Sequence, residues 1–366
     1  MKRFQTRFKN KKVILALGAD SSGGFAVFQN EQVYYQAGFG DLLNDDNFVK
    51  YSNSITAYLR KNKLKPELIL VDLHPLFRSI KLGEKLAVKH QARLVKVQHH
   101  IAHIFSAYGE YLLDHKEEKE FIGMACDGTG FGFDEKIWGG EVFQLKIKNY
   151  ELQFDRIAHL ENQLLIGGEM AVIEPTRALI AILNNFLSKA EVFKSVKKYY
   201  SRNEFELLFN QLQERFNCVE TSSTGRVLDA VAVLLGFVGN KSNFKHEPIR
   251  LLEENSTVPF DIDPEIFFDK NEQMFVVKTT PLFQYLIKNI QQDKKRLAAT
   301  AQLYLAKGLF AVAKQEKKKI FFAGGMADNK IMSEYLETND VFVNKQVSRG
   351  DEGLSWGQIC YYLLND

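Results

Sequence analysis

A duplicated unit constrains the fold of this 366-residue chain more than any other feature. Residues 13–20, VILALGAD, form an apolar segment that ends in a carboxylate, and a glycine-rich turn and two strand-like segments follow it. Residues 121–127, FIGMACD, end in the same way and lead into a second glycine-rich turn, 128–136, and two more strand-like segments. The two carboxylates, Asp20 and Asp127, are about 107 positions apart. A supersecondary unit that recurs at a fixed offset predicts duplicated lobes.

Helices and strands alternate after each unit, and this order predicts an α/β fold. We place the N-terminal lobe at 1–116 and the C-terminal lobe at 117–366, with the charged segment DHKEEKE at their junction. The C-terminal lobe is expected to carry a helical insertion at about 167–295, which includes one long helical segment at about 175–241. The last helix is expected to pack near the interface between the lobes.

Composition excludes several classes of protein. The chain has 48 Lys and Arg residues and 45 Asp and Glu residues, so it lacks the large excess of positive charge that is typical of proteins that bind nucleic acid. No apolar run reaches the roughly 18 residues that a membrane helix requires, and no signal peptide is visible. The three cysteines have no CxxC spacing, which argues against a zinc knuckle and a disulfide framework. We therefore expect a cytoplasmic protein without a membrane span or a nucleic-acid partner.

The segment VQHHIAH contains three of the eight histidines of the chain. If a helix begins here, His99 and His103 lie four residues apart on one face, and their imidazoles can share one metal ion. His100 then points elsewhere. Two ligands are too few for a tight site, so a carboxylate from another part of the chain is required. The alternative is a pair of histidines on a solvated face or in a satisfied core.

Two glycine-rich turns are candidates for binding a nucleotide. In DGTGFG, 127–132, the glycines permit backbone N–H groups to face phosphate oxygens, and Asp127 can hold a metal or its water. In GGMADN, 324–329, a strand enters a helix through two glycines. An ordinary hairpin and a tight strand–helix turn are the alternatives. Asp351, in the loop before the last helix, can supply the missing carboxylate or simply cap that helix.

Seven motifs in the same order resemble the C-terminal carbamoyltransferase part of HypF, a hydrogenase maturation protein. They are VDLHPLFRS, VQHHIAH, DGTGFG with IWGGE, GGEMAVIEPTRALI, TSSTGRVLDAVAVLLG, GGMADN and GDEGLSWGQ. The wider relatives include the universal tRNA-threonylcarbamoyl transferase and antibiotic O-carbamoyltransferases. The resemblance implies two duplicated actin-like/sugar-kinase lobes, the ASKHA or RNase H-like fold, with a cleft between them.

The resemblance also implies site residues, although none is identified as catalytic. It places an iron or zinc ion on His99, His103 and Asp351. It places ATP, ADP or carbamoyl-adenylate between a phosphate-side loop and a nucleoside-side loop. The matching positions are Asp127, Gly128, Thr129 and Gly130 in the first loop and Gly324, Gly325 and Asn329 in the second.

The implied reaction is transfer of a carbamoyl group from carbamoyl-adenylate to the C-terminal cysteine of HypE, a step toward nickel–iron hydrogenase. Nothing in this sequence resembles the donor-making YrdC-like domain of full-length HypF. We therefore expect a separate YrdC-like or full-length HypF protein to make the donor.

Besides Ile101, which stands where the family often has a third histidine, three positions depart from the family pattern. In FKHEPI, 244–249, Lys245 stands where an acid is usual and His246 where a glycine is usual. Glu352 also replaces a glycine, next to the expected ligand Asp351. These departures favour a second interpretation, a non-catalytic accessory protein that binds hydrogenase subunits or maturation factors. A tRNA-modifying paralogue is a third interpretation, but the motifs follow HypF rather than the tRNA enzyme.

Overall fold

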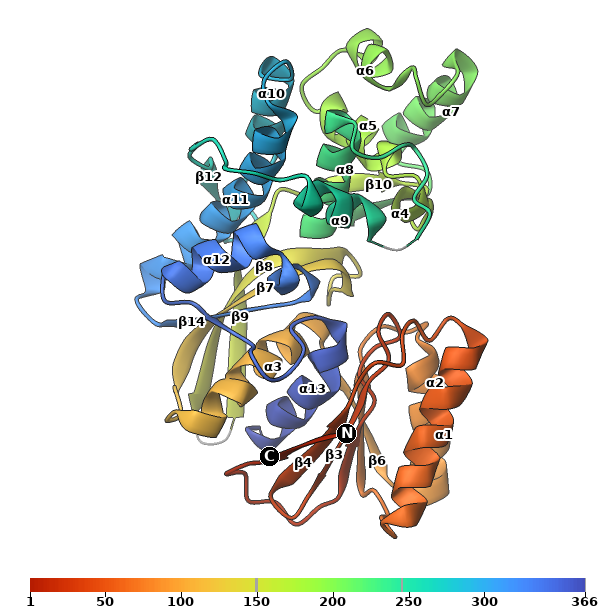
Figure 1. Ribbon diagram of the computed structural model, residues 1–366, viewed down its shortest axis with the longest axis vertical. Helices are drawn as coiled ribbons and strands as arrows, with labels where there is room; N and C mark the ends of the chain where they lie inside the picture. Colours follow the sequence, from red (N-terminus) through yellow and green to blue (C-terminus); the bar gives the residue numbers. More distant parts are fainter. Residues whose placement is uncertain (149–150, 245, 366) are drawn as a thin grey trace.

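Two β-sheets with helices around them make up the computed structural model, which describes residues 1–148, 151–244 and 246–365 (Figure 1). The first sheet has six strands in the order β1-β4-β3-β2-β5-β6. Its strands are β1 (Lys2–Gln5), β2 (Ile14–Ala16), β3 (Phe25–Gln29), β4 (Gln32–Gln36), β5 (Leu68–Asp72) and β6 (Arg93–Val97).

The second sheet has nine strands, and its main path is β12-β13-β9-β8-β7-β14-β15. Two further strands, β10 and β11, pair with each other, and β11 also pairs with β8. The strands are β7 (Glu120–Phe131), β8 (Ile137–Lys148), β9 (Glu151–Leu160), β10 (Gln163–Ile166), β11 (Cys218–Thr221), β12 (Ile266–Asp269), β13 (Met274–Val277), β14 (Lys319–Ala323) and β15 (Phe342–Val343).

The repeat predicted from the sequence is present in both sheets. In the first sheet β2, β3 and β4 form an antiparallel meander, β5 runs parallel to β2, and β6 runs parallel to β5. In the second sheet β7, β8 and β9 form the meander, and β14 and β15 follow in the same parallel arrangement. The predicted α/β class with duplicated lobes is therefore confirmed. The predicted boundary at 116/117 falls in the segment that joins the two units.

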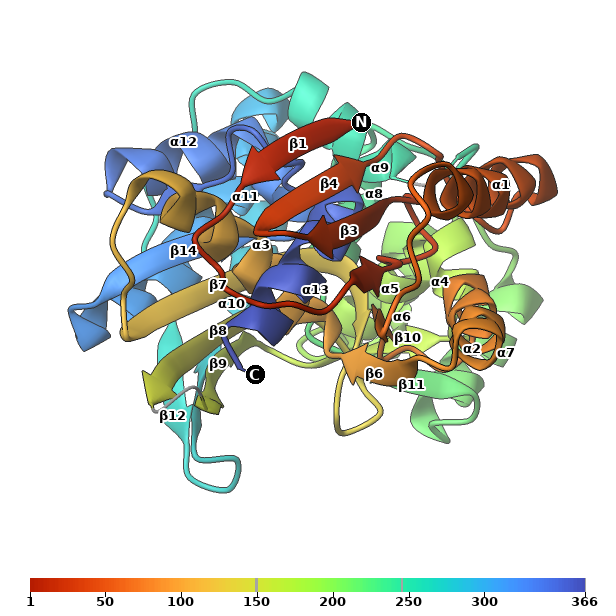
Figure 2. The same cartoon turned by 90° about the horizontal axis from the view of Figure 1, so that it is seen from below.

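Two helices are exchanged between the units. The helix after β6 is α3 (His99–Asp114), and the corresponding helix after β15 is α13 (Leu354–Leu363). These helices pack against each other between the two sheets (Figures 1 and 2). The first of them contacts β7 and β14, whereas α13 contacts β2 and β3, so each helix packs on the sheet of the other unit. The N-termini of both helices consequently face the interface between the lobes.

The remaining helices lie on the outer sides of the two sheets; some pack against a sheet, and several of those at the top of Figure 1 pack mainly on other helices. On the six-stranded sheet, α1 (Asp45–Lys61) and α2 (Arg78–His90) bury Leu15, Ile69 and Val71. On the nine-stranded sheet the core lies against α5, α8 and α11. The helices of this layer are α4 (Met170–Ile173), α5 (Thr176–Asn184), α6 (Lys189–Val196), α7 (Arg202–Gln213), α8 (Thr224–Leu235), α9 (Glu247–Glu254), α10 (Thr280–Lys288), α11 (Lys294–Ala313) and α12 (Lys330–Thr338). Three short 3-10 helices are η1 (Lys314–Glu316), η2 (Gly325–Asp328) and η3 (Asp351–Gly353). No helix of the described ranges combines the length and the apolar character that crossing a membrane demands.

The structure differs from two expectations. The prediction of a single long helical segment at 175–241 is wrong, because three separate helices, then β11 and then α8 occupy this range. Capping boxes at Ser188 and Ser201 start new helices there, with Glu191 and Glu204 as the reciprocal partners. The region 167–295 also contains β12 and β13, which extend the nine-stranded sheet beside β9.

The second difference concerns the turn that was expected at 128–136. It is shorter, because β7 continues through Phe131 with a register shift between Cys126 and Gly130. A β-bulge of this kind re-aims the side chains next to it.

A candidate metal and nucleotide site between the lobes

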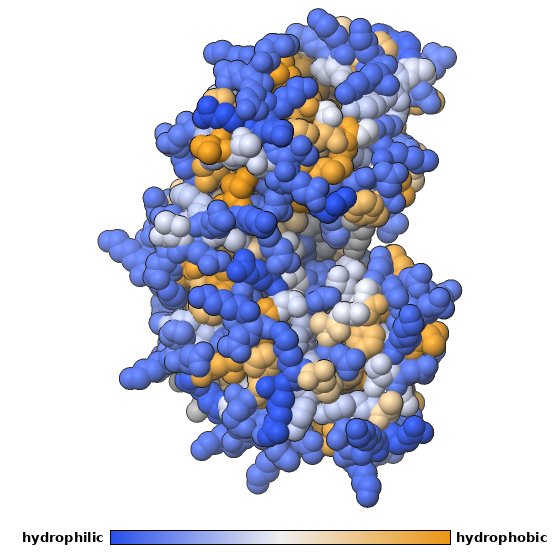
Figure 3. Space-filling view, viewed as in Figure 1, coloured by the Kyte–Doolittle hydropathy of each residue, from blue (hydrophilic) through white to orange (hydrophobic). Residues whose placement is uncertain are grey.

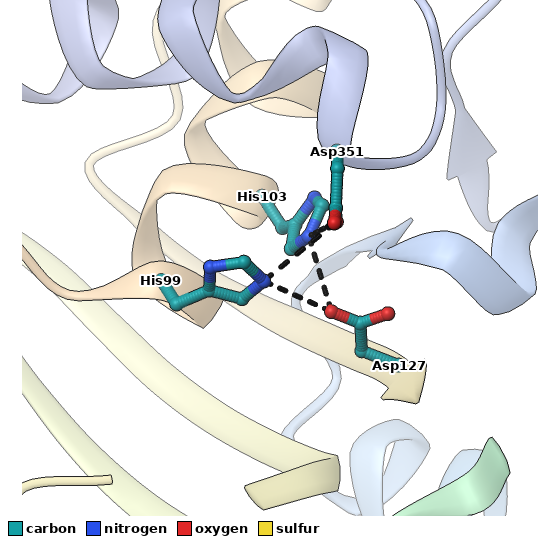
Figure 4. Close-up of side chains that lie close together, drawn as sticks. All are labelled: His99, His103, Asp127 and Asp351. Carbon is teal, nitrogen blue, oxygen red and sulfur yellow. Dashed lines mark hydrogen bonds and ion pairs between the residues drawn. The ribbon is translucent and has the colours of Figure 1, made fainter. Parts of the chain in front are cut away.

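Four side chains from three parts of the chain meet where the lobes face each other (Figure 4). His99 and His103 come from α3, Asp127 from β7 and Asp351 from η3, and one ligand atom of each lies within 4.8 Å of the others. His99 Nε2 is 2.9 Å from Asp127 Oδ2, and His103 Nε2 is 3.1 Å from Asp351 Oδ1. The structure thus brings together the three predicted metal ligands and adds Asp127, which the sequence had assigned to the phosphate-side loop.

Local structure explains how each ligand reaches this point. Side chains alternate along β7, so Asp127 shares the face of Phe121 and Ala125, which pack in the core with α3. The helix begins at His99 because the Gln98 side chain accepts a hydrogen bond from the Ile101 N–H. His99 and His103 then lie on one face of the helix, four residues apart.

Gly130 has a structural role, and its predicted contact with a nucleotide remains a prediction. A Cβ atom at this position would lie 2.2 Å from His100 Cε1 and 2.9 Å from His99 Cδ2. The glycine therefore allows β7 to approach the histidines. His100 is fully buried on the side away from the cluster, and its Nδ1 lies 3.1 Å from Gln98 Nε2. Burial, together with the charge on His99, lowers the pKa of His100 to about 3.

Opposite charges within the cluster shift the pKa values of His99, His103 and Asp127. Burial by itself lowers the pKa of His99, but Asp72, Asp127 and Asp351 outweigh burial and raise this pKa well above its usual value. Burial also opposes the charged form of His103, whose pKa is nevertheless raised by its bonds to Asp127 and Asp351. Burial raises the pKa of Asp127, but the two histidines overcome it and hold this pKa well below its usual range. Without a metal, the cluster is therefore a set of buried ion pairs.

The donor atoms fit a divalent transition metal. Two imidazole nitrogens and two carboxylate oxygens form a ligand set that suits zinc or iron, and the two negative charges offset the charge of the ion. Both histidines are buried, which keeps their rings in place. The nitrogen of His99 that faces away from the cluster, Nδ1, contacts Asp72 Oδ2 at 2.7 Å. Sequence reasoning missed Asp72, although its place at the end of an apolar strand resembles that of Asp127.

A cavity of about 420 Å³ opens beside the cluster. Figure 3 shows the surface hollowed between the two lobes on this face. Asp127 and Asp351 line the cavity, and so do the predicted nucleotide-binding residues Gly325 and Asn329. The other lining residues are Ser22, His246, Ile249, Arg250, Glu253, Met326, Asp328, Ser348, Arg349, Gly350 and Glu352. The C-terminal lobe therefore forms almost all of the cavity wall, Ser22 of the N-terminal lobe adds to it, and the metal cluster lies at one side.

The other predicted nucleotide-binding residues lie around the cavity and do not line it. The Gly128 N–H donates to Asp127 Oδ1, and Thr129 is exposed. Gly324 has φ +101°, and a Cβ there would lie 2.2 Å from the Cys126 carbonyl oxygen. A Cβ on Gly325 would lie 2.9 Å from Asp127 Oδ1, so this glycine gives the carboxylate its space.

Asn329 also has a structural role. Its Oδ1 accepts the Met332 N–H at the start of α12, and its Nδ2 donates to Gln302 Oε1 at 2.6 Å. Its contact with a nucleotide remains a prediction.

Two of the departures from the family pattern lie on the cavity wall. His246 has φ +68°, a left-handed conformation that favours glycine, and its side chain reaches toward Gly128. Glu352 also lines the cavity and accepts a hydrogen bond from the Ser348 hydroxyl. Lys245, the third departure, lies outside the described residues. The loss of glycine at 246 thus places an imidazole beside the candidate nucleotide cavity.

Comparisons with known proteins match the whole chain. Residues 9–110 match the family described as the HypF Kae1-like domain, and residues 123–358 match the second subdomain of the carbamoyltransferase Kae1-like domain. The probable carbamoyltransferase HypF of Methanocaldococcus jannaschii is 34% identical over 99% of this chain and 48% of its own length. The carbamoyltransferase HypF of a Synechocystis species is 27% identical over 87% of this chain and 42% of its own length.

Solved structures of HypF proteins are also similar to this chain. The crystal structure of full-length HypF in its phosphate- and nucleotide-bound form has a TM-score of 0.87 at 25% identity and covers 99% of this chain and 57% of that chain. The crystal structure of T. kodakarensis HypF has a TM-score of 0.85 at 30% identity and covers 99% of this chain and 48% of that one. The chain thus spans about half the length of the relatives it matches. By sequence and by fold, the chain belongs to the HypF family and corresponds to its Kae1-like part.

Proposed function

We propose that this chain is a carbamoyltransferase of nickel–iron hydrogenase maturation. The carbamoyl group would pass from carbamoyl-adenylate to the C-terminal cysteine thiol of a HypE-like acceptor. The observation that carries this proposal is the pair of carboxylates, Asp127 and Asp351, which belong both to the histidine cluster and to the wall of the cavity. A metal ion and a nucleotide bound at these two places would lie side by side.

Each part of the site has a role in this proposal. His99, His103, Asp127 and Asp351 would hold one iron or zinc ion. When bound, such an ion supplies Lewis acidity and a template for an acyl phosphate group. The cavity would hold the adenylate, with Asp127 on the phosphate side and Gly325 and Asn329 on the nucleoside side. The phosphate- and nucleotide-bound form of the HypF relative supports a ligand of this type.

The proposal assigns donor synthesis to another protein. A YrdC-like or full-length HypF protein would make carbamoyl-adenylate, and this chain would transfer the group. The thiol of the acceptor must come within about 3–3.5 Å of the donor carbonyl for the step to occur. In the transfer a C–S bond forms, the C–O bond to AMP breaks, and the thiol proton leaves with the released phosphate or with water.

Mass spectrometry of the acceptor tests the proposal. The metal-loaded chain is incubated with carbamoyl-adenylate and a HypE-like protein, and the acceptor should gain about 43 Da on its terminal cysteine, as covalent acyl transfer requires. An acceptor with Ser in place of that cysteine should gain nothing, and Asp351→Asn should transfer much more slowly. No mass gain with metal and nucleotide both bound would exclude the transferase activity.

The same experiment addresses a second candidate function, an accessory protein that binds hydrogenase subunits or maturation factors. The position of His246 and Glu352 on the cavity wall favours this alternative, because both side chains take up space that a donor would use. An accessory protein would bind its partner with or without carbamoyl-adenylate and would leave the acceptor mass unchanged.

A further inference from the structure

Asp72 is a buried carboxylate that none of the predicted roles includes. It is the last residue of β5 and has no exposed surface. Side-chain alternation places it on the face of Leu68 and Leu70, which pack in the core that includes α3 and α13. Its register partner in β6 is Val97, two residues before the helix that carries the histidines. The pairing of β5 with β6 therefore places Asp72 beside the start of α3.

The two oxygens of Asp72 have different partners. Oδ1 accepts the His74 backbone N–H at 2.9 Å, and Oδ2 lies 2.7 Å from His99 Nδ1. On the other side of the ring, His99 Nε2 lies 2.9 Å from Asp127 Oδ2. Asp72 belongs to the six-stranded sheet and Asp127 to the nine-stranded sheet, so the imidazole of His99 bridges the two lobes.

His103 provides an internal comparison. Its Nε2 faces Asp127 and Asp351, but its Nδ1 is buried and has no hydrogen-bond partner among the described residues, so packing alone holds the ring on that side. The ring of His99, in contrast, has a carboxylate on the nitrogen opposite the metal position. Such a partner fixes the proton on Nδ1 and leaves the Nε2 lone pair for the ion.

We infer that Asp72 is the positioning residue of the metal site. It sets the tautomer and the orientation of the His99 ring. It also links the N-terminal sheet to the metal site, although the strands of that sheet contribute no ligand. This inference rests on the metal site of the proposed function. Outer partners of this kind usually change metal affinity about 10- to 100-fold when they are removed.

Asp72→Asn separates positioning from simple packing. An asparagine can keep the bond to the His74 N–H through its oxygen, but its NH₂ group then faces His99 Nδ1. A donor at this place favours the tautomer with the proton on Nε2, which blocks the metal. The matched control is Asp20→Asn, since Asp20 is also buried in the N-terminal lobe but accepts only the backbone N–H groups of Arg78 and Ser79.

Metal affinity is the measurement. Zinc is titrated in competition with a chromophoric chelator, the visible spectrum of the cobalt form reports the ligands, and circular dichroism reports folding. Asp72→Asn should bind zinc about 10- to 100-fold more weakly and change the cobalt spectrum, whereas Asp20→Asn should match the wild type in both. A folded Asp72→Asn variant with wild-type affinity and spectrum would overturn the inference and leave the proposed function standing.

Wild-type protein gives a second test that does not depend on a variant that folds. Nitrogen-15 NMR of the zinc-bound protein should show His99 with its proton on Nδ1 and the metal on Nε2. Metal on Nδ1 would overturn the inference even if Asp72→Asn does not fold. A wild-type chain that binds no zinc, cobalt or iron would remove both the metal site of the proposed function and the role of Asp72.

Discussion

At the residue scale, one histidine can be removed to separate metal binding from packing. His103→Ala takes away a ligand nitrogen, so protein purified without chelator should retain far less than the about one metal ion per chain expected of the wild type. His100→Ala should keep the metal, because His100 faces Gln98 and Trp138 and lies away from the cluster. Elemental analysis decides the outcome. Equal, sub-stoichiometric metal in the wild type and in His103→Ala would show that the cluster is not a metal site.

Glu141 predicts a pH dependence of stability. This fully buried carboxylate accepts the N–H groups of Gly139 and Gly140 and pairs with Arg156 at 2.6 Å. Burial raises its pKa, but Arg156 and the neighbouring histidines prevail and lower it from 4.5 to about 2. Because the folded pKa is the lower one, the charged form stabilises the protein at neutral pH by about 3 kcal/mol, and this contribution is lost as the pH falls from 4.5 toward 2.

Urea unfolding of the wild type and of Glu141→Gln across this range measures the effect. The difference in unfolding free energy should be largest near pH 7 and should shrink below pH 4.5, where the wild-type carboxyl begins to take up a proton. A difference that stays constant from pH 7 to pH 3 would mean that the charge of Glu141 contributes nothing to stability.

Residue identities could be predicted from the sequence more easily than their neighbours in space. The i, i+4 spacing indicated that His99 and His103 share a face, and the structure confirms this arrangement. The residues alone suggested that Asp127 could hold a metal or its water, whereas the family resemblance assigned it to the phosphate-side loop; the strand continues past Asp127, whose carboxylate contacts His99. Asp72 was missed because its partner is set by the pairing of two strands, which no local pattern records.

At the element scale, the approach of β7 to α3 depends on Gly130. In Gly130→Ala the methyl group would collide with His100 and His99, and we expect a loss of about 1–3 kcal/mol in the free energy of unfolding. Metal affinity should fall as well, because His99 must move. Gly239→Ala is the matched control, since a methyl group on this exposed glycine would have no atoms within 4 Å and the change should stay within about 0.5 kcal/mol.

Urea titration and metal content of the two variants check this prediction. If Gly130→Ala keeps the stability and the metal of the wild type, the register shift in β7 must tolerate a side chain and the close approach is unimportant.

Elements were predicted best where they are strongly periodic. The strands around residues 14, 25, 32, 68 and 121 and the helix around 296–313 are found as expected, since buried strands and long amphipathic helices leave clear patterns. The segment 175–241 was predicted wrongly because the helical spacing of one stretch within it, GRVLDAVAVLLGF, was taken to represent the whole range. The breaks there come from the caps at Ser188 and Ser201 and from the pairing of β11 with β10, a contact between distant segments.

At the scale of the whole molecule, the exchanged helices explain why the site lies between the lobes. Each unit contributes its last helix to the sheet of the other, so α3 and α13 lie together and bring His99, His103 and Asp351 to one place. The duplication was visible in the sequence, but the exchange was not, because nothing local distinguishes a helix that packs on its own sheet from one that packs on its neighbour. A ligand in the cavity would contact mainly the C-terminal lobe, with Ser22 of the N-terminal lobe beside it, and should stabilise the folded chain.

This arrangement predicts that adenine nucleotides stabilise the chain when metal is present. A ligand at a hundred times its dissociation constant adds about 2.7 kcal/mol to the free energy of unfolding, which corresponds to a rise of about 3–4 °C in melting temperature for a chain of this size. Thermal denaturation is followed with ATP, ADP and adenosine, each with and without zinc. Adenosine should give the smallest rise because it has no phosphate to approach the metal ion that Asp127 and Asp351 would hold, and the rise with ATP should decrease in Asp351→Asn, which removes one of the charges that hold the ion. A melting temperature that stays flat with every nucleotide would mean that the cavity does not bind adenine nucleotides, and it would favour the accessory protein over the carbamoyltransferase.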